Sequence, residues 1–138
     1  AERIASRDGV LYADSSALVK LFLREAESAA LVRAVSDRIV ATSAISSVEI
    51  VRAIRVASAS DDIEWDLDDV LGGCTIVGVE EDVVRSASAL AGPGLRALDA
   101  VHLASALHVG ARAMVVYDRQ LARAARSAGL SAESPGVA

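Results

Sequence analysis

The run Val10-Leu11-Tyr12-Ala13, which ends abruptly at Asp14, is typical of a buried strand. Similar short apolar runs recur at residues 39–41, 75–79, 114–117 and, near the C-terminus, 130–132. Helical patterns separate these runs and begin near Ser15, Glu27, Ala44, Ile63, Glu80, Leu98 and Arg119. Strands that alternate with helices need crossover connections, which predict a parallel sheet covered on both faces. We therefore expect a three-layer α/β domain with a sheet of four to five strands.

The length and composition are those of one domain. A chain of 138 residues can bury about two-thirds of the surface that it exposes when unfolded. We expect a single domain over residues 1–138, with its core at about 10–132. Cys74 is the only cysteine, so no intramolecular disulfide can form. No apolar run approaches the roughly 20 residues of a membrane span, and residues 1–9 lack the apolar stretch of a secretory signal. These features favour a cytoplasmic protein without a membrane segment.

The formal net charge of −5 argues against a nucleic-acid-binding protein, which usually carries excess positive charge. Two observations weaken this objection. A site that binds divalent cations must itself be acidic, and the bound ions then supply positive charge locally. Thirteen of the 14 basic residues are arginine, the side chain best shaped to bind phosphate, and Lys20 is the exception.

Two acidic residues, Asp14 and Asp118, each follow a predicted apolar strand directly. Open parallel sheets bind ligands beyond the carboxyl ends of their strands, so both side chains are expected at the same rim. The alternative is that each carboxylate caps the helix that follows it. Matching positions in both cases favour a functional role.

Two further acids, Glu49 and Asp99, lie within predominantly apolar helical segments. A buried carboxylate needs a partner. For Glu49 the local alternatives are a capping box with Ser46 and an ion pair with Arg52. For Asp99 the alternative is a charge that the N-terminus of its helix favours. His102, three residues after Asp99, is expected to hydrogen-bond Asp99, to contact substrate, or to be a packed core histidine with satisfied hydrogen bonds.

If these four carboxylates converge, their mutual repulsion favours a divalent cation. At an effective dielectric constant of about 20, two unit charges roughly 4 Å apart repel by about 4 kcal/mol. Ligands that are all oxygen suit Mg²⁺ or Mn²⁺ better than zinc. Such an ion would activate a bound water and steady the charge of a phosphate group, which predicts a metal-dependent nuclease.

Four segments, in this order and spacing, resemble the signature blocks of PIN domains, and most closely those of the VapC toxins of bacterial toxin–antitoxin pairs. The resemblance covers nearly the whole chain. The segments are Asp14-Ser15-Ser16-Ala17-Leu18-Val19-Lys20, Ser46-Ser47-Val48-Glu49, Leu98-Asp99-Ala100-Val101-His102-Leu103-Ala104 and Tyr117-Asp118-Arg119-Gln120-Leu121.

The resemblance implies a parallel sheet in the order 3-2-1-4-5 and a ribonuclease dependent on Mg²⁺ or Mn²⁺. It further implies a homodimer and a small antitoxin protein as partner. Ser15 and Ser46 match the hydroxyl positions that accompany the first acid and the glutamate. The acids that it implies as catalytic and metal-binding are Asp14, Glu49, Asp99 and Asp118.

The chain departs from the family pattern at Gln120, where many relatives carry a further Asp or Asn. This departure bears on whether a second metal ion binds. The N-terminal residues 1–8 also extend beyond the usual lead into the first strand, and no role is assigned to them. RNA contacts are expected from scattered arginines, among them Arg24, Arg52, Arg55 and Arg119.

Two other functions remain open. A phosphatase or phosphotransferase would use Asp14 as its nucleophile, but such enzymes usually have a second Asp two residues on, where this chain has Ser16. They also need a lysine from a later loop, and Lys20 lies on the first helix. A non-catalytic binding module with the same fold is the second alternative, and the presence of all four acids disfavours it.

Overall fold

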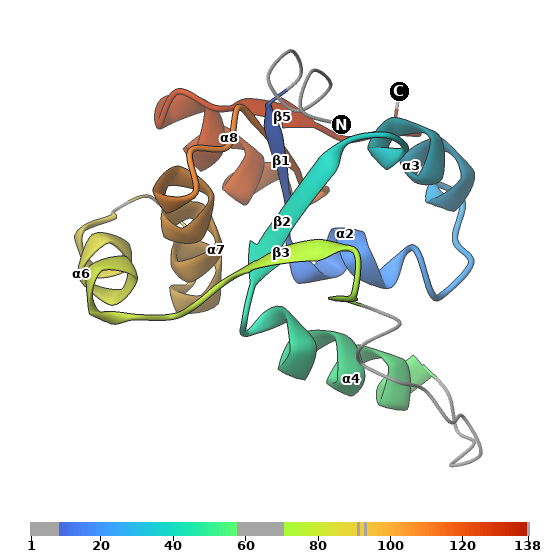
Figure 1. Ribbon diagram of the computed structural model, residues 1–138, viewed down its shortest axis with the longest axis horizontal. Helices are drawn as coiled ribbons and strands as arrows, with labels where there is room; N and C mark the ends of the chain where they lie inside the picture. The colour runs from blue at the N-terminus through green and yellow to red at the C-terminus, as the bar shows by residue number, and fades with distance from the viewer. Residues whose placement is uncertain (1–8, 58–70, 91, 93, 138) are drawn as a thin grey trace.

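A computed structural model of the chain describes residues 9–57, 71–90, 92 and 94–137 (Figure 1). Its five strands form one parallel sheet in the order β3-β2-β1-β4-β5, which confirms the expected topology. The strands are β1 (Val10–Ala13), β2 (Ile39–Ser43), β3 (Cys74–Val77), β4 (Ala113–Val115) and β5 (Ser131–Glu133).

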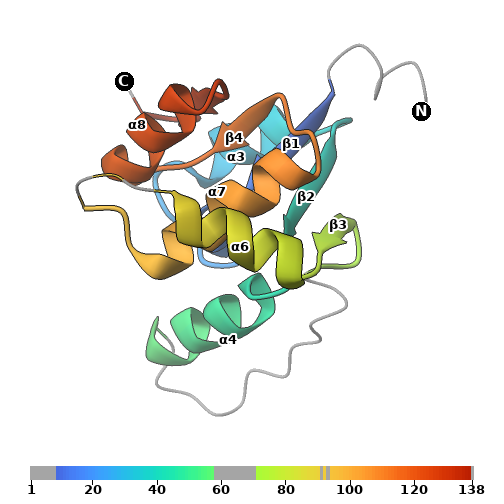
Figure 2. The ribbon, with the colours of Figure 1, turned by 90° about the vertical axis from the view of Figure 1, so that its left-hand side faces the viewer.

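Helices cover both faces of this sheet, as Figures 1 and 2 show from two directions. Apolar side chains of the first three helices pack on one face, and those of the last three pack on the other. The first group is α2 (Ser15–Val19), α3 (Ser28–Val35) and α4 (Ser46–Ala57), and the second is α6 (Glu81–Ala89), α7 (Ala97–His108) and α8 (Arg119–Ser127). Among the residues described, no helix combines the length and the apolar character needed to span a membrane.

The alternation of side chains along β1 divides the core into two halves. Leu11 and Ala13 face the cluster that includes helices α2, α3 and α4. Tyr12 faces the opposite cluster, with Leu103 of α7 and Leu121 of α8. All five side chains are at most 1% exposed. A strand buried on both faces reads as a continuous apolar run, which explains why β1 shows no polar alternation.

The expected boundary of the fourth strand was wrong by two residues. The strand β4 ends at Val115, so Asp118 lies three residues beyond it, at the start of α8. Asp14, by contrast, follows β1 directly, as expected. The two acids therefore occupy different positions relative to their strands. The helix expected at 63–71 and the N-terminal extension lie almost wholly outside the described residues.

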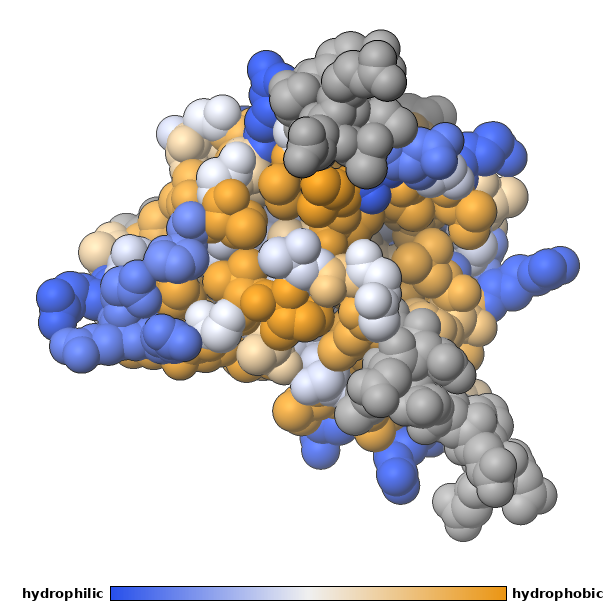
Figure 3. Space-filling model, viewed as in Figure 1, coloured by the Kyte–Doolittle hydropathy of each residue, from blue (hydrophilic) through white to orange (hydrophobic). Residues whose placement is uncertain are grey.

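Apolar side chains also reach the surface at the β3 edge of the sheet. Figure 3 shows apolar surface across the middle of the viewed face, with strongly polar side chains toward its margins. Ile39 of β2 is 40% exposed and Ile76 of β3 is 44% exposed. The first helix also ends at Val19, so Leu21 and Phe22, expected as its apolar positions, lie beyond it and are exposed.

The position of α7 depends on Leu103, which is 1% exposed. We expect Leu103→Ala to lower the free energy of unfolding by about 3 kcal/mol, because it removes buried methyl groups and leaves a cavity. Leu107→Ala, one turn later on the same helix at a side chain 41% exposed, is the matched control and should cost less than about 1 kcal/mol. Urea denaturation measures both, and equal losses would contradict this account of the core.

Candidate active site

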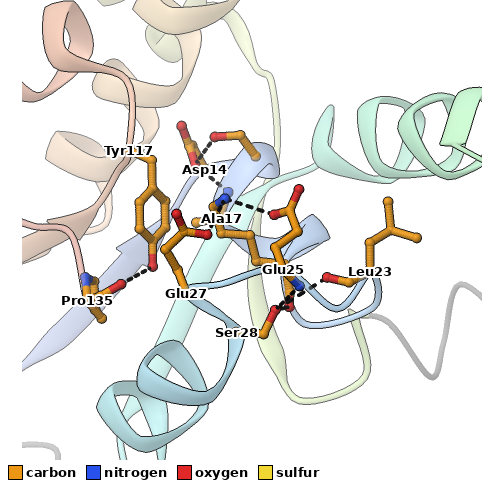
Figure 4. A network of polar contacts seen from close by, with 10 residues as sticks. Asp14, Ala17, Leu23, Glu25, Glu27, Ser28, Tyr117 and Pro135 are labelled. Carbon is orange, nitrogen blue, oxygen red and sulfur yellow. Dashed lines mark hydrogen bonds and ion pairs between the residues drawn. The ribbon is translucent and has the colours of Figure 1, made fainter. Parts of the chain in front are cut away.

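Asp14 is a buried carboxylate at the end of the central strand. It caps α2, where its Oδ1 accepts hydrogen bonds from the Ala17 N–H (2.9 Å) and the Ser16 hydroxyl (3.0 Å) (Figure 4). Its side chain is 5% exposed. Burial raises the pKa of Asp14 despite these hydrogen bonds and the nearby His102, and the charge of Asp99 raises it further. Within the described chain both donors bind Oδ1, so Oδ2 is available to a further ligand.

Glu49 lies in the first turn of α4, and its side chain is 26% exposed. Its Oε1 atom lies 2.7 Å from Nε2 of His102. Burial raises the pKa of Glu49, but the hydrogen bond and charge of His102 and the hydroxyl of Ser15 outweigh it, so the net shift is downward. The capping box with Ser46, one alternative for Glu49, does not form, because the Glu49 N–H donates to the Ile45 carbonyl (3.1 Å) and the Ser46 hydroxyl is bonded to that of Thr42 (2.7 Å). The ion pair expected with Arg52 is likewise replaced by the contact with His102, 53 positions away in the sequence.

His102 is the packed histidine with satisfied hydrogen bonds that the sequence predicted. It is 2% exposed, and its two ring nitrogens are both used. Nδ1 lies 2.7 Å from the hydroxyl of Tyr12, whose ring it meets edge to face. Its carboxylate partner is Glu49, whereas the sequence pointed to Asp99. Because the ring is buried, it cannot contact a substrate directly.

Asp99 lies at the third position of α7. This agrees with the alternative interpretation, in which the N-terminus of the helix favours the charge. Its Oδ2 accepts the Arg96 N–H at 3.4 Å, in front of the positive end of the helix. The side chain is half-buried. Its charge acts on Asp14, which places both carboxylates in one electrostatic environment.

Asp118 is an exposed carboxylate that caps α8. Its Oδ1 accepts the Leu121 N–H at 2.9 Å, and Arg119 beside it is exposed as well. Over the described ranges, no hydrogen bond or ion pair joins Asp118 to Asp14, Glu49 or Asp99. In the same ranges no three side chains of Asp, Glu, His and Cys are arranged to hold a metal ion. Each of the four carboxylates has a hydrogen-bond donor of its own, and metal binding by the full set stays a prediction.

Three side chains of this region were not identified from the sequence. Ser16, rather than Ser15, bonds Asp14, while the hydroxyl of Ser15 lowers the pKa of Glu49. Tyr12 was assigned only to a strand, although a buried tyrosine hydroxyl usually has a hydrogen-bond partner. Thr42 links β1 and α4, since its hydroxyl donates to the Ala13 carbonyl and bonds Ser46. An Asp followed two residues later by Ser was the one available signal, because such pairs bond locally at helix starts.

A second polar network lies beside Asp14 and involves the only lysine. Lys20 bonds Glu25 at 2.8 Å and Glu27 at 3.2 Å, and its ammonium lies 4.7 Å from the ring centre of Tyr117 (Figure 4). The Tyr117 hydroxyl donates to the Pro135 carbonyl at 2.8 Å. Lys20 is therefore paired with two carboxylates, which disfavours it as the free cation that an aspartate-based phosphotransferase requires.

Comparisons with known proteins give one family and several similar sequences. A family model described as the PIN domain matches residues 11–127. Ribonuclease VapC35 of Mycobacterium tuberculosis (strain CDC 1551 / Oshkosh) is 37% identical over 136 residues, which cover 94% of this chain and 99% of that protein. Ribonuclease VapC47 of the same strain is 31% identical, with 93% and 98% covered. Ribonuclease VapC46 of strain ATCC 25618 / H37Rv is 33% identical, with 91% and 97% covered.

The burial of Asp14 predicts a pH-dependent cost to stability. Its pKa in the folded protein lies above the unfolded value, so ionisation destabilises the fold as the pH rises through the folded pKa. Asp14→Asn keeps the cap but not the charge, and should raise the midpoint of thermal unfolding by several degrees at neutral pH in EDTA. The gain should vanish below the pKa of an unfolded aspartate, where both side chains are neutral.

The matched control is Asp118→Asn, which also keeps a capping oxygen but at an exposed position. This substitution should change the midpoint much less, because the carboxylate that it removes is already hydrated. Equal effects of the two substitutions at neutral pH would show that the burial of Asp14 carries no such cost.

Proposed function

Because the chain belongs to the PIN domain family, we propose that it is an endoribonuclease dependent on Mg²⁺ or Mn²⁺ and the toxin of a type II toxin–antitoxin pair. The similarity to three proteins named ribonuclease VapC, over more than nine-tenths of each sequence, supports this function. The observation that carries the proposal is the buried carboxylate of Asp14 at the carboxyl end of β1, with Asp99 and the His102–Glu49 pair beside it.

The donors present fit a divalent cation. Asp14 is a buried carboxylate with an oxygen available, and no lysine or arginine of the described chain pairs with it. A buried charge without a counter-charge is costly, and oxygen ligands suit Mg²⁺ and Mn²⁺. Asp14, Glu49, Asp99 and Asp118 would hold the ion. When bound, it supplies an activated water and positive charge beside the scissile phosphate.

The chain's own residues hold the carboxylates in place. Asp14 is fixed by the N-terminus of α2 and the Ser16 hydroxyl, through a single oxygen. Asp118 is fixed in the same way by the N-terminus of α8. Each therefore keeps a second oxygen for a ligand while its backbone is held by a helix. This order lowers the entropic cost of assembling the site.

Arginines on α8 supply the positive charge that an RNA substrate needs. Arg119, Arg123 and Arg126 lie at i, i+4 and i+7, so they share one face, and all three are exposed. None of them forms an ion pair with another residue of the described chain. The stripe begins next to Asp118, which favours an RNA backbone that runs from the candidate active site along α8.

The proposal includes a homodimer and a small antitoxin as protein partner, both of which the family resemblance implies, and a cytoplasmic location, which a chain with a single cysteine suits. A non-catalytic binding module is the competing function. RNA cleavage distinguishes the ribonuclease from the binding module, since a module would bind RNA without cutting it.

Removing one carboxylate should abolish cleavage. We expect Asp14→Asn and Asp99→Asn each to slow RNA cleavage in Mn²⁺ by roughly 100-fold or more, which corresponds to about 2.7 kcal/mol of lost transition-state stabilisation. EDTA should stop the wild-type protein. Cleavage of a labelled RNA by purified protein without antitoxin measures both effects.

Asp37→Asn is the matched control, because Asp37 is exposed at the opposite end of β2 and its φ of 62° suits asparagine equally. It should cleave like the wild type. Full activity of Asp14→Asn or Asp99→Asn would remove that residue from the site, and no metal-dependent cleavage by the wild type would favour the binding module.

The arginine stripe predicts a salt-dependent contact. Replacing Arg119, Arg123 and Arg126 together by glutamine should weaken the binding of a single-stranded RNA in EDTA. It should also reduce the slope of log affinity against log salt by about 2, since each phosphate contact with a single strand contributes roughly 0.7. Fluorescence anisotropy at several salt concentrations measures this slope. Arg85→Gln, at an exposed arginine paired with Glu81, is the control, and an equal loss there would assign the effect to total charge.

A further inference from the structure

A buried chain of hydrogen bonds connects β1, α7 and α4. The hydroxyl of Tyr12 lies 2.7 Å from Nδ1 of His102, and Nε2 of the same ring lies 2.7 Å from Oε1 of Glu49. Tyr12 is 0% exposed and His102 is 2% exposed, so water does not compete for these bonds. This chain of hydrogen bonds ends at Glu49 on α4, one of the four carboxylates of the candidate active site.

Two hydroxyls near Tyr12 have already donated their protons to backbone carbonyls. Ser105 donates to the Val101 carbonyl at 2.7 Å, and Thr42 donates to the Ala13 carbonyl at 2.7 Å. Both hydroxyls lie near Tyr12, where they lower its pKa against the larger effect of burial. Their single protons are already used, so toward Tyr12 they can only accept. Tyr12 can therefore accept no proton from either hydroxyl, and burial raises its pKa so that it keeps its own proton.

The proton on Nε2 of His102 follows from its partner. A carboxylate only accepts hydrogen bonds, so an Nε2 atom 2.7 Å from Glu49 must carry a proton. In the neutral ring Nδ1 then accepts from Tyr12. In the doubly protonated ring Nδ1 donates to Tyr12, whose own O–H then turns away from the ring. The tautomer with its proton on Nδ1 alone is excluded, because it would place a lone pair against the carboxylate.

We propose that Tyr12 and His102 are positioning residues that hold the Glu49 carboxylate at the candidate active site, a role that rests on the proposed function. Glutamate has several rotatable bonds, and an unbound side chain in the first turn of α4 would sample many rotamers. The histidine selects one of them. Because the ring is buried, His102 acts on the reaction by holding Glu49 and not by contact with substrate.

The position of Tyr12 explains why the strand and the two helices are linked at this point. Tyr12 and Asp14 are two residues apart on one strand and its direct continuation, so their side chains leave β1 on the same side. A protonated His102 lowers the pKa of Asp14, and the charge of Asp14 raises the pKa of Tyr12, so the three groups lie near one another. The hydrogen-bond chain thus fixes Glu49 relative to the same strand that places Asp14.

The experiment compares His102→Ala and His102→Gln with His108→Gln in the full chain. The chain contains two histidines, and His108 is exposed and pairs with Asp82 at 3.4 Å, which makes it the matched control. The affinity for Mn²⁺ is measured by calorimetry without RNA, and kcat and KM are measured with labelled RNA. Thermal unfolding identifies any variant that does not fold.

We expect His102→Ala to weaken Mn²⁺ binding by about 10- to 100-fold and to lower kcat much more than it raises KM. His102→Gln should restore most of the affinity, because its amide N–H can occupy the position of Nε2. His108→Gln should behave like the wild type. A folded His102→Ala variant with wild-type Mn²⁺ affinity and kcat would overturn the proposal, and so would a folded His102→Gln variant that binds Mn²⁺ no better than His102→Ala.

Nitrogen NMR of the metal-free protein tests the hydrogen bonds separately from the proposed function. The His102 signals, assigned by their absence in His102→Gln, should show a proton on Nε2 in the wild type. Tyr12→Phe should change the Nδ1 signal, and Tyr117→Phe, at the other tyrosine, should not. A neutral ring with its proton on Nδ1 would overturn the proposal. Wild-type protein that bound no Mn²⁺ would instead overturn the proposed function, and the NMR signals would still decide the order of the hydrogen bonds.

Discussion

The central strand β1 is buried on both faces, and the alternation of its side chains constrains the rest of the structure. Leu11 and Ala13 pack in one half of the core and Tyr12 packs in the other. Asp14 continues this alternation, so its side chain leaves the strand on the same side as that of Tyr12. A slip of one residue would exchange the two sets and bury a carboxylate among apolar side chains. The pairing of β1 with β2 and β4 therefore fixes both the core and the place of the first acid.

Helix capping and a role in the candidate active site are compatible for these acids. The sequence posed them as alternatives for Asp14, Asp118 and Asp99. In the structure each of the three accepts a backbone N–H at the start of a helix, and the contact occupies one oxygen of the carboxylate. A carboxylate has two oxygens, so the cap can hold the side chain while the second oxygen faces a ligand. Local stability and site geometry thus depend on the same residues.

The sequence predicted the strands and helices, which depend on the periodicity of apolar residues. It did not predict side-chain contacts between residues that are distant in the sequence. Apolar spacing was sufficient to locate the strands and most helices, and the resemblance supplied the order of the strands. The partners considered as alternatives for Glu49 were its neighbours in the sequence, whereas the structure pairs it with His102 on another helix. That pairing arises because α7 buries His102, and a buried ring must satisfy both nitrogens. The end of β4 was misjudged because Val116 is as buried and apolar as the strand residues before it.

The four acids differ in exposure, so the candidate active site has a buried end and an exposed end. Asp14 is buried, Glu49 and Asp99 are half-buried, and Asp118 lies at the surface where the arginines of α8 begin. A charge in the interior is costly because it loses its hydration. The same carboxylate binds a cation most strongly there, because screening by water and salt is weakest. A polyanion needs the opposite, an exposed surface with free positive charge. The gradient therefore favours cation binding at the Asp14 end and RNA contact at the Asp118 end, which reconciles a net charge of −5 with a nucleic-acid substrate.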